Sequence, residues 1–99
     1  MARLENQAAL FKALSDPNRL GILELIRKRC GPDCKISADD AGNTVSEIAA
    51  EFELSLSTVS HHVRELKNAG LIRCQKRGQW VYCAPNRDVL EGLSRFLSP

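Results

Sequence analysis

Cysteine is the residue type in this sequence with the widest chemical range, and two of the four cysteines are close together. Cys30 and Cys34 are separated only by Gly-Pro-Asp, so a turn could bring both sulfurs onto one ion, with Asp33, Asp39 or Asp40 as nearby oxygen ligands. Thiolates bind thiophilic ions, so the expected ion is arsenite, zinc, cadmium or copper(I). Two thiolates fill neither the four sites of zinc nor the three of a trivalent arsenical, so a third donor must come from elsewhere. The spacing permits a metal site, a redox or persulfide switch, or a purely structural pair.

Cys74 and Cys83 are the possible further donors. If the chain between them turns at Arg77-Gly78, Cys74 faces Val81, and the two cysteines lie diagonally on one face of a β-ribbon. A disulfide between them would then require the diagonal gap to close. Half-buried strand residues without a sensing role are the simpler interpretation.

Positive charge is concentrated in one segment. The 99 residues carry a net charge of only +2, but five basic side chains between positions 56 and 79 stand against Glu65 alone. Positions 38–55, just before this segment, contain five acidic residues and no lysine or arginine. A concentrated positive field attracts nucleic acid, although a solvated charged surface is the alternative.

Hydrophobic periodicity predicts the elements that position these residues. Helices are expected near 2–14, 17–29, 45–53, 56–69 and 86–97, with a hairpin over 71–84 and a long loop over 30–43. Asp16-Pro17 is typical of a helix start, Thr44 and Glu47 match a capping box, and Gly70 is placed to end a helix. The chain is too short for a second core, so we expect a single, mainly α domain over 1–99 with a two- or three-stranded β-ribbon.

The helix expected over 56–69 has a buried stripe of Val59, Val63 and Leu66, so its opposite face is polar and cationic. Small hydroxyl side chains near a helix start let its amides approach phosphates and base edges, while cations further along neutralise phosphates. Two short helices followed by a basic hairpin are typical of a winged helix-turn-helix, whose wing reaches an adjacent groove. The expected contacts to double-stranded DNA are Ser57, Thr58, Ser60, His61, Arg64, Lys67, Asn68, Lys76, Arg77, Gly78 and Gln79.

Each of the two histidines is better explained by a non-catalytic role. His61 and Glu65 could hold zinc at i, i+4, but His61 lies on the expected DNA face, and DNA contact is favoured. His62 lies towards Leu66, where a partly buried histidine with satisfied hydrogen bonds is expected. No nucleophile elbow or glycine-rich phosphate loop surrounds them, so the sequence predicts that the protein is not an enzyme.

The first and last helices carry more apolar surface than a small domain hides by itself. We therefore expect a homodimer, which would also stabilise a domain of this size. Its interface is assigned to Leu4, Ala8, Phe11, Val89, Leu90, Leu93, Phe96 and Leu97.

The amino-terminal residues do not form the continuous apolar segment of a signal peptide, and no stretch approaches the roughly 18 apolar residues that span a bilayer. The expected location is the cytoplasm, without membrane association. Thiols are normally reduced there, so reactive or ligating cysteines are favoured over a disulfide framework.

Three segments resemble the ArsR/SmtB repressors, and they occur in the order found in that family. They are FKALSDPNRL at 11–20, LSTVSHHVREL at 56–66 and RGQWVY at 77–82. The resemblance implies a homodimeric winged-helix repressor that binds operator DNA and releases it when an inducer, commonly a metal ion or metalloid, is bound.

The sequence also departs from that family. Many members carry a cysteine pair in the third helix, where this chain has no thiol at 45–49, and others bind zinc on the last helix, where this chain has Asp88 and Glu91 but no histidine. The segment 30–43 is longer than is usual. A thiophilic metal or metalloid inducer is the leading expectation. A redox- or persulfide-responsive repressor, or a winged-helix protein-interaction module, is the alternative.

Overall fold

The structure is a computed structural model that describes residues 2–30 and 44–99. It contains five helices and one hairpin, which confirms the mainly α fold class. In chain order they are α1 (Ala2–Ala13), α2 (Pro17–Arg29), α3 (Val45–Phe52), α4 (Leu56–Asn68), β1 (Ile72–Arg77), β2 (Trp80–Pro85) and α5 (Arg87–Leu97). Each helix begins and ends within one residue of its expected position. Apart from Cys30, the loop expected over 30–43 lies outside the described residues.

Side-chain caps explain where the helices begin. The Asp16 carboxylate accepts from the backbone N–H groups of Asn18 and Arg19 at 2.8 and 3.1 Å, and Pro17 follows as the first residue of α2. Thr44 Oγ1 accepts from the Glu47 N–H at 3.2 Å at the start of α3. The Glu47 carboxylate accepts from the Thr44 hydroxyl at 2.8 Å, whereas a capping box would engage the Thr44 amide. The Thr44 backbone instead forms a bridge with Tyr82 of β2.

The core lies between α2, α3, α4 and the base of the hairpin. Its fully buried large side chains come from all of these elements: Ile22, Ile26, Ile48, Val59, Leu66 and Leu71. Helix α1 adds Leu10, which is 8% exposed, and α5 adds Leu93, which is 7% exposed. Burial of these apolar surfaces fixes α4 against the other helices and leaves its opposite face outward.

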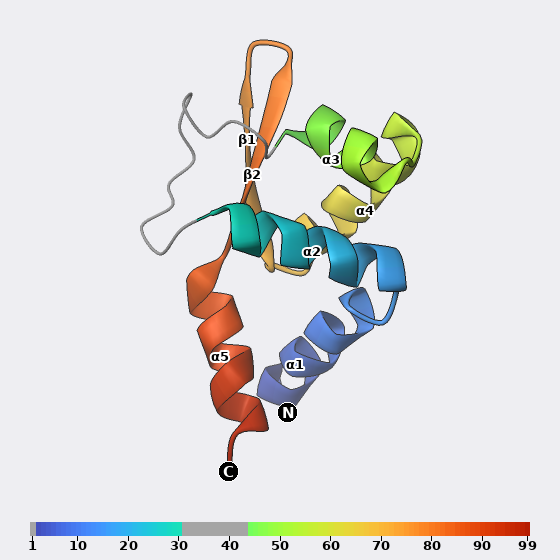
Figure 1. Cartoon of the computed structure of the whole chain (residues 1–99). Helices are drawn as coiled ribbons and strands as arrows, with labels where there is room; N and C mark the ends of the chain where they lie inside the picture. Colours follow the sequence, from blue (N-terminus) through green and yellow to red (C-terminus); the bar gives the residue numbers. More distant parts are fainter. Residues whose placement is uncertain (1, 31–43) are drawn as a thin grey trace.

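The two strands form an antiparallel ribbon that projects from the helices (Figure 1). Arg77 pairs with Trp80, so the turn consists of Gly78 and Gln79 rather than Arg77-Gly78. Gly78 has a φ of 60°, and hairpin turns with a glycine at the first central position require such a value. The expected register was therefore wrong, and Cys74 lies directly opposite Cys83 rather than on a diagonal to it.

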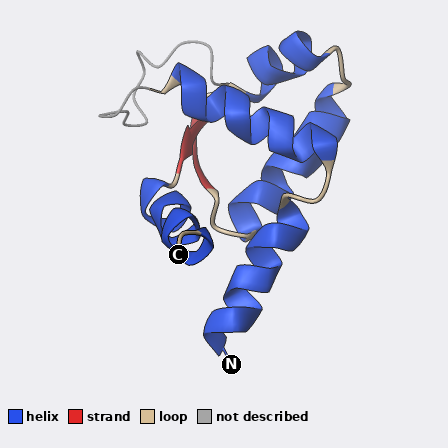
Figure 2. Cartoon of the chain, turned by 60° about the horizontal axis from the view of Figure 1, so that its bottom comes forward, coloured by secondary structure: helices blue, strands red, loops and turns tan. Residues whose placement is uncertain are grey.

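Helices α1 and α5 lie at the end of the molecule opposite the hairpin tip, with both chain termini (Figure 1). Figure 2 shows that α1 extends away from the rest of the molecule towards the N-terminus. At the start of α5, Arg87 donates from Nη2 to the carbonyl oxygen of Cys30 at 3.1 Å, which joins α5 to the end of α2. Within the described residues, no helix is long and apolar enough to cross a membrane.

Candidate nucleic-acid interface

Helices α3 and α4 form a helix-turn-helix unit with a tight connection. Glu53 ends α3 with a left-handed φ of 53°, and the N–H of Leu54 donates to the carbonyl of Ala49 at 3.1 Å. Ser55 then caps α4, because its hydroxyl oxygen accepts from the Thr58 N–H at 3.2 Å. These bonds define the end of α3 and the start of α4, and the two helices pack against each other.

The two faces of α4 differ as the sequence predicts. Val59, Val63 and Leu66 are buried in the core. The seven expected DNA-contacting residues of α4 all remain accessible: Ser57, His61, Arg64, Lys67 and Asn68 are exposed, while Thr58 and Ser60 are half-buried. The outer face of α4 is therefore available to a partner and carries two cations.

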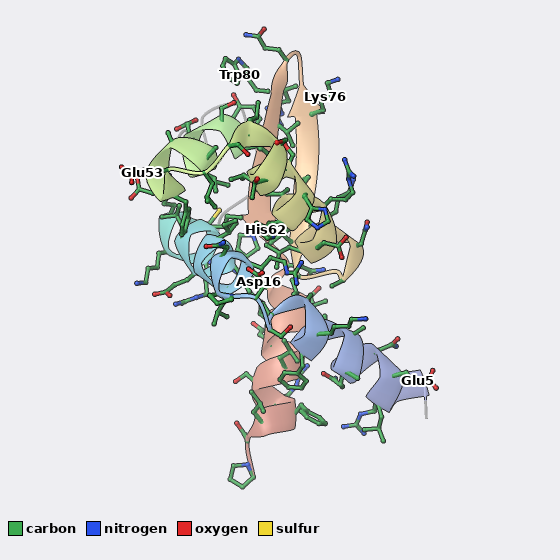
Figure 3. The ribbon with its side chains drawn as sticks, turned by 90° about the vertical axis from the view of Figure 1, so that its right-hand side faces the viewer. Glu5, Asp16, Glu53, His62, Lys76 and Trp80 are labelled. Carbon is green, nitrogen blue, oxygen red and sulfur yellow. The ribbon has the colours of Figure 1, made fainter. Side chains whose placement is uncertain are left out.

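The hairpin places further polar residues at its tip. Lys76, Gly78 and Gln79 are exposed, and Arg77 is half-buried, with its guanidinium donating to Gln75 Oε1 at 3.3 Å. Figure 3 shows Lys76 and Trp80 near the far end of the hairpin. Trp80 is the first residue of β2, and its side chain is 44% exposed. Trp80 directly follows the Gly78-Gln79 turn, and this position near the hairpin tip was the sequence signal that its side chain would be exposed.

A groove of about 250 Å³ lies between α4 and the hairpin. Ser60, Arg64 and Lys67 line it from α4, and Cys74 and Val81 line it from the ribbon. Arg64 and Lys67 of α4 therefore lie where α4 meets the base of the wing.

The two histidines lie on different sides of α4, with ring centroids 5.8 Å apart. His61 is exposed on the outer face, whereas His62 is 8% exposed and points into the molecule (Figure 3). The burial of His62 agrees with expectation. Its Nδ1 atom, however, has no hydrogen-bond partner among the described residues, so the expected satisfaction of the ring is not observed.

The structure separates the cysteines into two groups. Cys30 is buried and disulfide-bonded, so its sulfur is not a thiolate ligand in this state, and Cys34 lies outside the described residues. Cys74 and Cys83 are free, with their sulfur atoms 3.8 Å apart. In the described part of the chain, no three His, Cys, Asp or Glu side chains are grouped as a metal site.

The residues assigned to the dimer interface also divide into groups. Leu4, Ala8, Phe11, Phe96 and Leu97 are exposed, and Val89 and Leu90 are half-buried. Leu93 is 7% exposed and packs mainly within its own chain, so it offers little surface to a second subunit. The periodicity of α5 does not distinguish apolar positions covered by the same chain from those left open.

Comparisons with known proteins agree with this architecture. A family model described as a helix-turn-helix domain matches residues 14–75. The transcriptional repressor SdpR of Bacillus subtilis is 37% identical over 82 residues, which span 83% of this chain and 78% of that protein. The arsenical resistance operon repressor of the same organism is 32% identical over 84% of this chain and 69% of its own length.

Among solved structures, a homodimeric winged helix-turn-helix DNA-binding domain from Mycobacterium bovis, described as a possible ArsR-family regulator, superposes with a TM-score of 0.73. It is 26% identical, and the superposition covers 96% of this chain and 78% of that one. The family and the fold that this chain matches are those of DNA-binding regulators and not of enzymes. The family match over residues 14–75, the relatives and the winged fold together show that this chain belongs to the ArsR family of winged helix-turn-helix transcriptional regulators.

Proposed function

We propose that this chain represses transcription as a homodimer that inserts α4 of each subunit into successive major grooves of an operator, with the wing against an adjacent groove. The observation that carries the proposal is the split of α4 into a buried apolar face and an accessible face with Arg64 and Lys67, which line a groove between α4 and the wing. Cations so placed neutralise phosphates, while the short polar side chains at the start of α4 reach base edges. The relatives are repressors, and the operator requires a location with the chromosome, which we take to be the cytoplasm.

The dimer is proposed to form through α1 and α5. Leu4 and Leu97 are 52% and 68% exposed, and Phe11 and Phe96 are 38% and 40% exposed. Large apolar side chains grouped on one side of a small protein are typical of a subunit interface. The structurally similar Mycobacterium bovis domain is homodimeric, which supports the same arrangement here.

The inducer is proposed to be a thiophilic metal or metalloid ion, as the arsenical resistance relative suggests. Among the described residues, Cys74 and Cys83 are the two thiols that face each other. Two soft ligands suit copper(I), or arsenite with one oxygen ligand retained, better than the four-coordinate sites of zinc or cadmium. Titration of the reduced dimer with each of the four ions, with operator release as the readout, tests this choice. Unchanged responses in Cys74→Ser/Cys83→Ser would contradict a role for this pair.

DNA binding is tested with a duplex selected from a randomised pool by repeated rounds of capture. We expect selected half-sites separated by one helical turn, about 10 bp, or a multiple of it. Affinity should fall steeply with salt, and Arg64→Ala/Arg77→Ala should lower it at least about tenfold and reduce the salt slope by roughly 1 per lost phosphate contact.

The matched control is Arg27→Ala/Lys28→Ala, which removes two cations from the exposed end of α2 and should retain the affinity. Equal losses in the two double variants would show that only net charge matters. Absent or salt-insensitive binding would favour a protein-interaction module instead.

A further inference from the structure

The wing contains two free thiols that face each other at its base. Cys74 on β1 and Cys83 on β2 are direct partners in the antiparallel register. Their sulfur atoms are 3.8 Å apart and within weak hydrogen-bonding distance. Neither thiol takes part in the proposed contacts between α4 and DNA.

The hydrogen-bond pattern of the ribbon shows which kind of pair they form. Antiparallel pairs alternate between hydrogen-bonded and non-hydrogen-bonded, and side chains are closer in the second kind. The Asn86 N–H donates to the Leu71 carbonyl at 2.9 Å, so the next pair, Ile72 with Pro85, is non-hydrogen-bonded, as the missing N–H of proline requires. Cys74 and Cys83 are two residues further along and belong to the same class.

This class of pair has a backbone separation that accepts a disulfide. Its Cα atoms are about 4.5 Å apart, inside the range of about 4.4–6.8 Å found for disulfides. The two sulfur atoms need to approach by about 1.8 Å to reach a bond length of roughly 2.05 Å. Rotation of the two side chains can supply most of this movement without a change of register.

The two thiols are not equivalent. Cys83 is 2% exposed, whereas Cys74 is half-buried and lines the groove that also contains Arg64 and Lys67. The hydrogen bond from the Cys83 thiol and the charge of Lys67 lower the pKa of Cys74, against the effect of burial. The same hydrogen bond, together with burial, raises the pKa of Cys83. Because Cys74 lines the groove and Cys83 is buried behind it, Cys74 is the thiol that a small oxidant reaches first.

We propose that Cys74 and Cys83 form a redox-active dithiol that a small hydroperoxide oxidises to a disulfide across the wing. The Cys74 thiolate attacks the terminal peroxide oxygen and the O–O bond breaks. The other oxygen takes up the proton that the Cys74 thiol released and leaves as an alcohol, or as water from hydrogen peroxide, so that Cys74 becomes a sulfenic acid. The Cys83 sulfur then attacks the Cys74 sulfur, the S–O bond breaks, and the hydroxyl leaves with the Cys83 proton as water. Two thiols lose two electrons in total, and the peroxide gains them. A dithiol reductant reverses the reaction by thiol–disulfide exchange.

Arg64 and Lys67 give the groove a second property. A positive environment at the entrance favours the Cys74 thiolate and the anionic character that develops on the peroxide oxygen. The disulfide would join β2 to β1, the strand that carries Lys76 and Arg77, and so would cross-link the wing covalently. The oxidation itself needs no contact with DNA, so it is tested separately from the proposed repressor function.

The experiment uses the whole reduced chain, treated with hydrogen peroxide at equimolar concentration and digested under conditions that preserve disulfides. We expect mass spectrometry to find peptides linked through Cys74 and Cys83, and dithiothreitol to release them. In Cys83→Ser, dimedone should trap a sulfenic acid on Cys74, and Cys74→Ser should yield no sulfenic acid in the wing. Iodoacetamide should alkylate Cys74 roughly tenfold faster than Cys83 near neutral pH.

Lys67→Gln provides a readout that a purely structural role would not change. The pH midpoint for alkylation of Cys74 should rise in this variant, while Arg27→Gln, on a different surface, should leave it unchanged. In wild type, absence of the linked peptide together with over-oxidation of Cys74 to sulfinic acid would overturn the proposal, as would linkage only between subunits. Arg77→Ala removes a proposed phosphate contact and does not line the groove, so this variant should still form the linked peptide although it binds DNA more weakly. It separates failure of this proposal from failure of the repressor function.

Discussion

The ring of Phe11 on α1 lies 5.9 Å from the ring of Phe96 on α5, with an angle of 51° between the ring planes. Both rings are partly exposed, so the contact belongs to the surface that joins the first and last helices. Tilted aromatic pairs at this distance are stabilising beyond the area that they bury. The pair therefore holds α1 and α5 together as one apolar surface that a second copy can cover.

Phe96→Ser/Leu97→Ser should weaken the dimer. The change removes two exposed apolar side chains from the proposed interface, and the dimer dissociation constant should rise at least about tenfold, or roughly 1.4 kcal/mol. Sedimentation equilibrium measures the constant. Leu20→Ser is the matched control, because Leu20 is 50% exposed on α2 and lies outside the proposed interface. A dimer that withstands the double substitution and dissociates in the control would place the interface on α2.

Gly78→Ala should destabilise the wing. A Cβ at this position meets no atom within 4 Å, so the cost comes from the φ of 60° alone. Left-handed backbone costs an alanine about 1–2 kcal/mol. Urea unfolding should show a loss in this range, and Gly78→Asn should lose less, because asparagine adopts positive φ more readily. If both variants were as stable as wild type, the turn would not have the backbone conformation described here.

Thr44→Ala should destabilise the fold by about 1 kcal/mol, because it removes the side-chain cap of α3. Thr44 is 4% exposed, and its hydroxyl bonds to both the N–H and the carboxylate of Glu47. Ser46→Ala, two residues later on the exposed side of α3, should change the free energy of unfolding by less than half as much. Thermal unfolding of the two variants at one pH gives the comparison.

Asp16→Asn should flatten the acid dependence of stability. The Arg19 N–H, followed by the Asn18 N–H, holds the pKa of Asp16 below its usual 3.8, although partial burial opposes this shift. A lowered folded-state pKa means that the charged cap stabilises the fold above the unfolded-state pKa and loses this effect as pH falls through the lower folded-state value.

The melting temperature, followed downwards from neutral pH, should therefore decrease less steeply below about pH 4 in Asp16→Asn than in wild type. Asp88→Asn is the control, because it removes a carboxylate of the same charge from the start of α5. An unchanged acid dependence in Asp16→Asn would show that this cap is not linked to proton binding.

The sequence determines the helices well because their ends carry local chemical signals. Every helix start leaves backbone N–H groups without a partner inside the helix. Here the side chains of Asp16, Thr44 and Ser55 accept from these groups, and such local contacts can be predicted without the rest of the fold. The polar face of α4 follows from the same local periodicity. This is why the residues of that face were identified correctly as accessible.

The hairpin register and the role of Leu93 depended on information that local sequence does not contain. A glycine at position 78 is compatible with a turn at 77–78 or at 78–79, and only the strand pairing decides between them. That single choice changes Cys74 from a diagonal to a direct partner of Cys83. Leu93 belongs to the same apolar stripe as Phe96, but the packing of α5 on its own chain covers one and leaves the other open.

The bond from Arg87 to the Cys30 carbonyl has a mechanical consequence. It ties the first turn of one outer helix to the last turn of a central core helix, at positions 57 residues apart in the chain. A rotation of α5 against a second subunit would therefore pull on α2, which in turn packs against α4. In two copies joined through their outer helices, such a rotation would change the spacing between the two α4 helices. No hinge in the core would be needed.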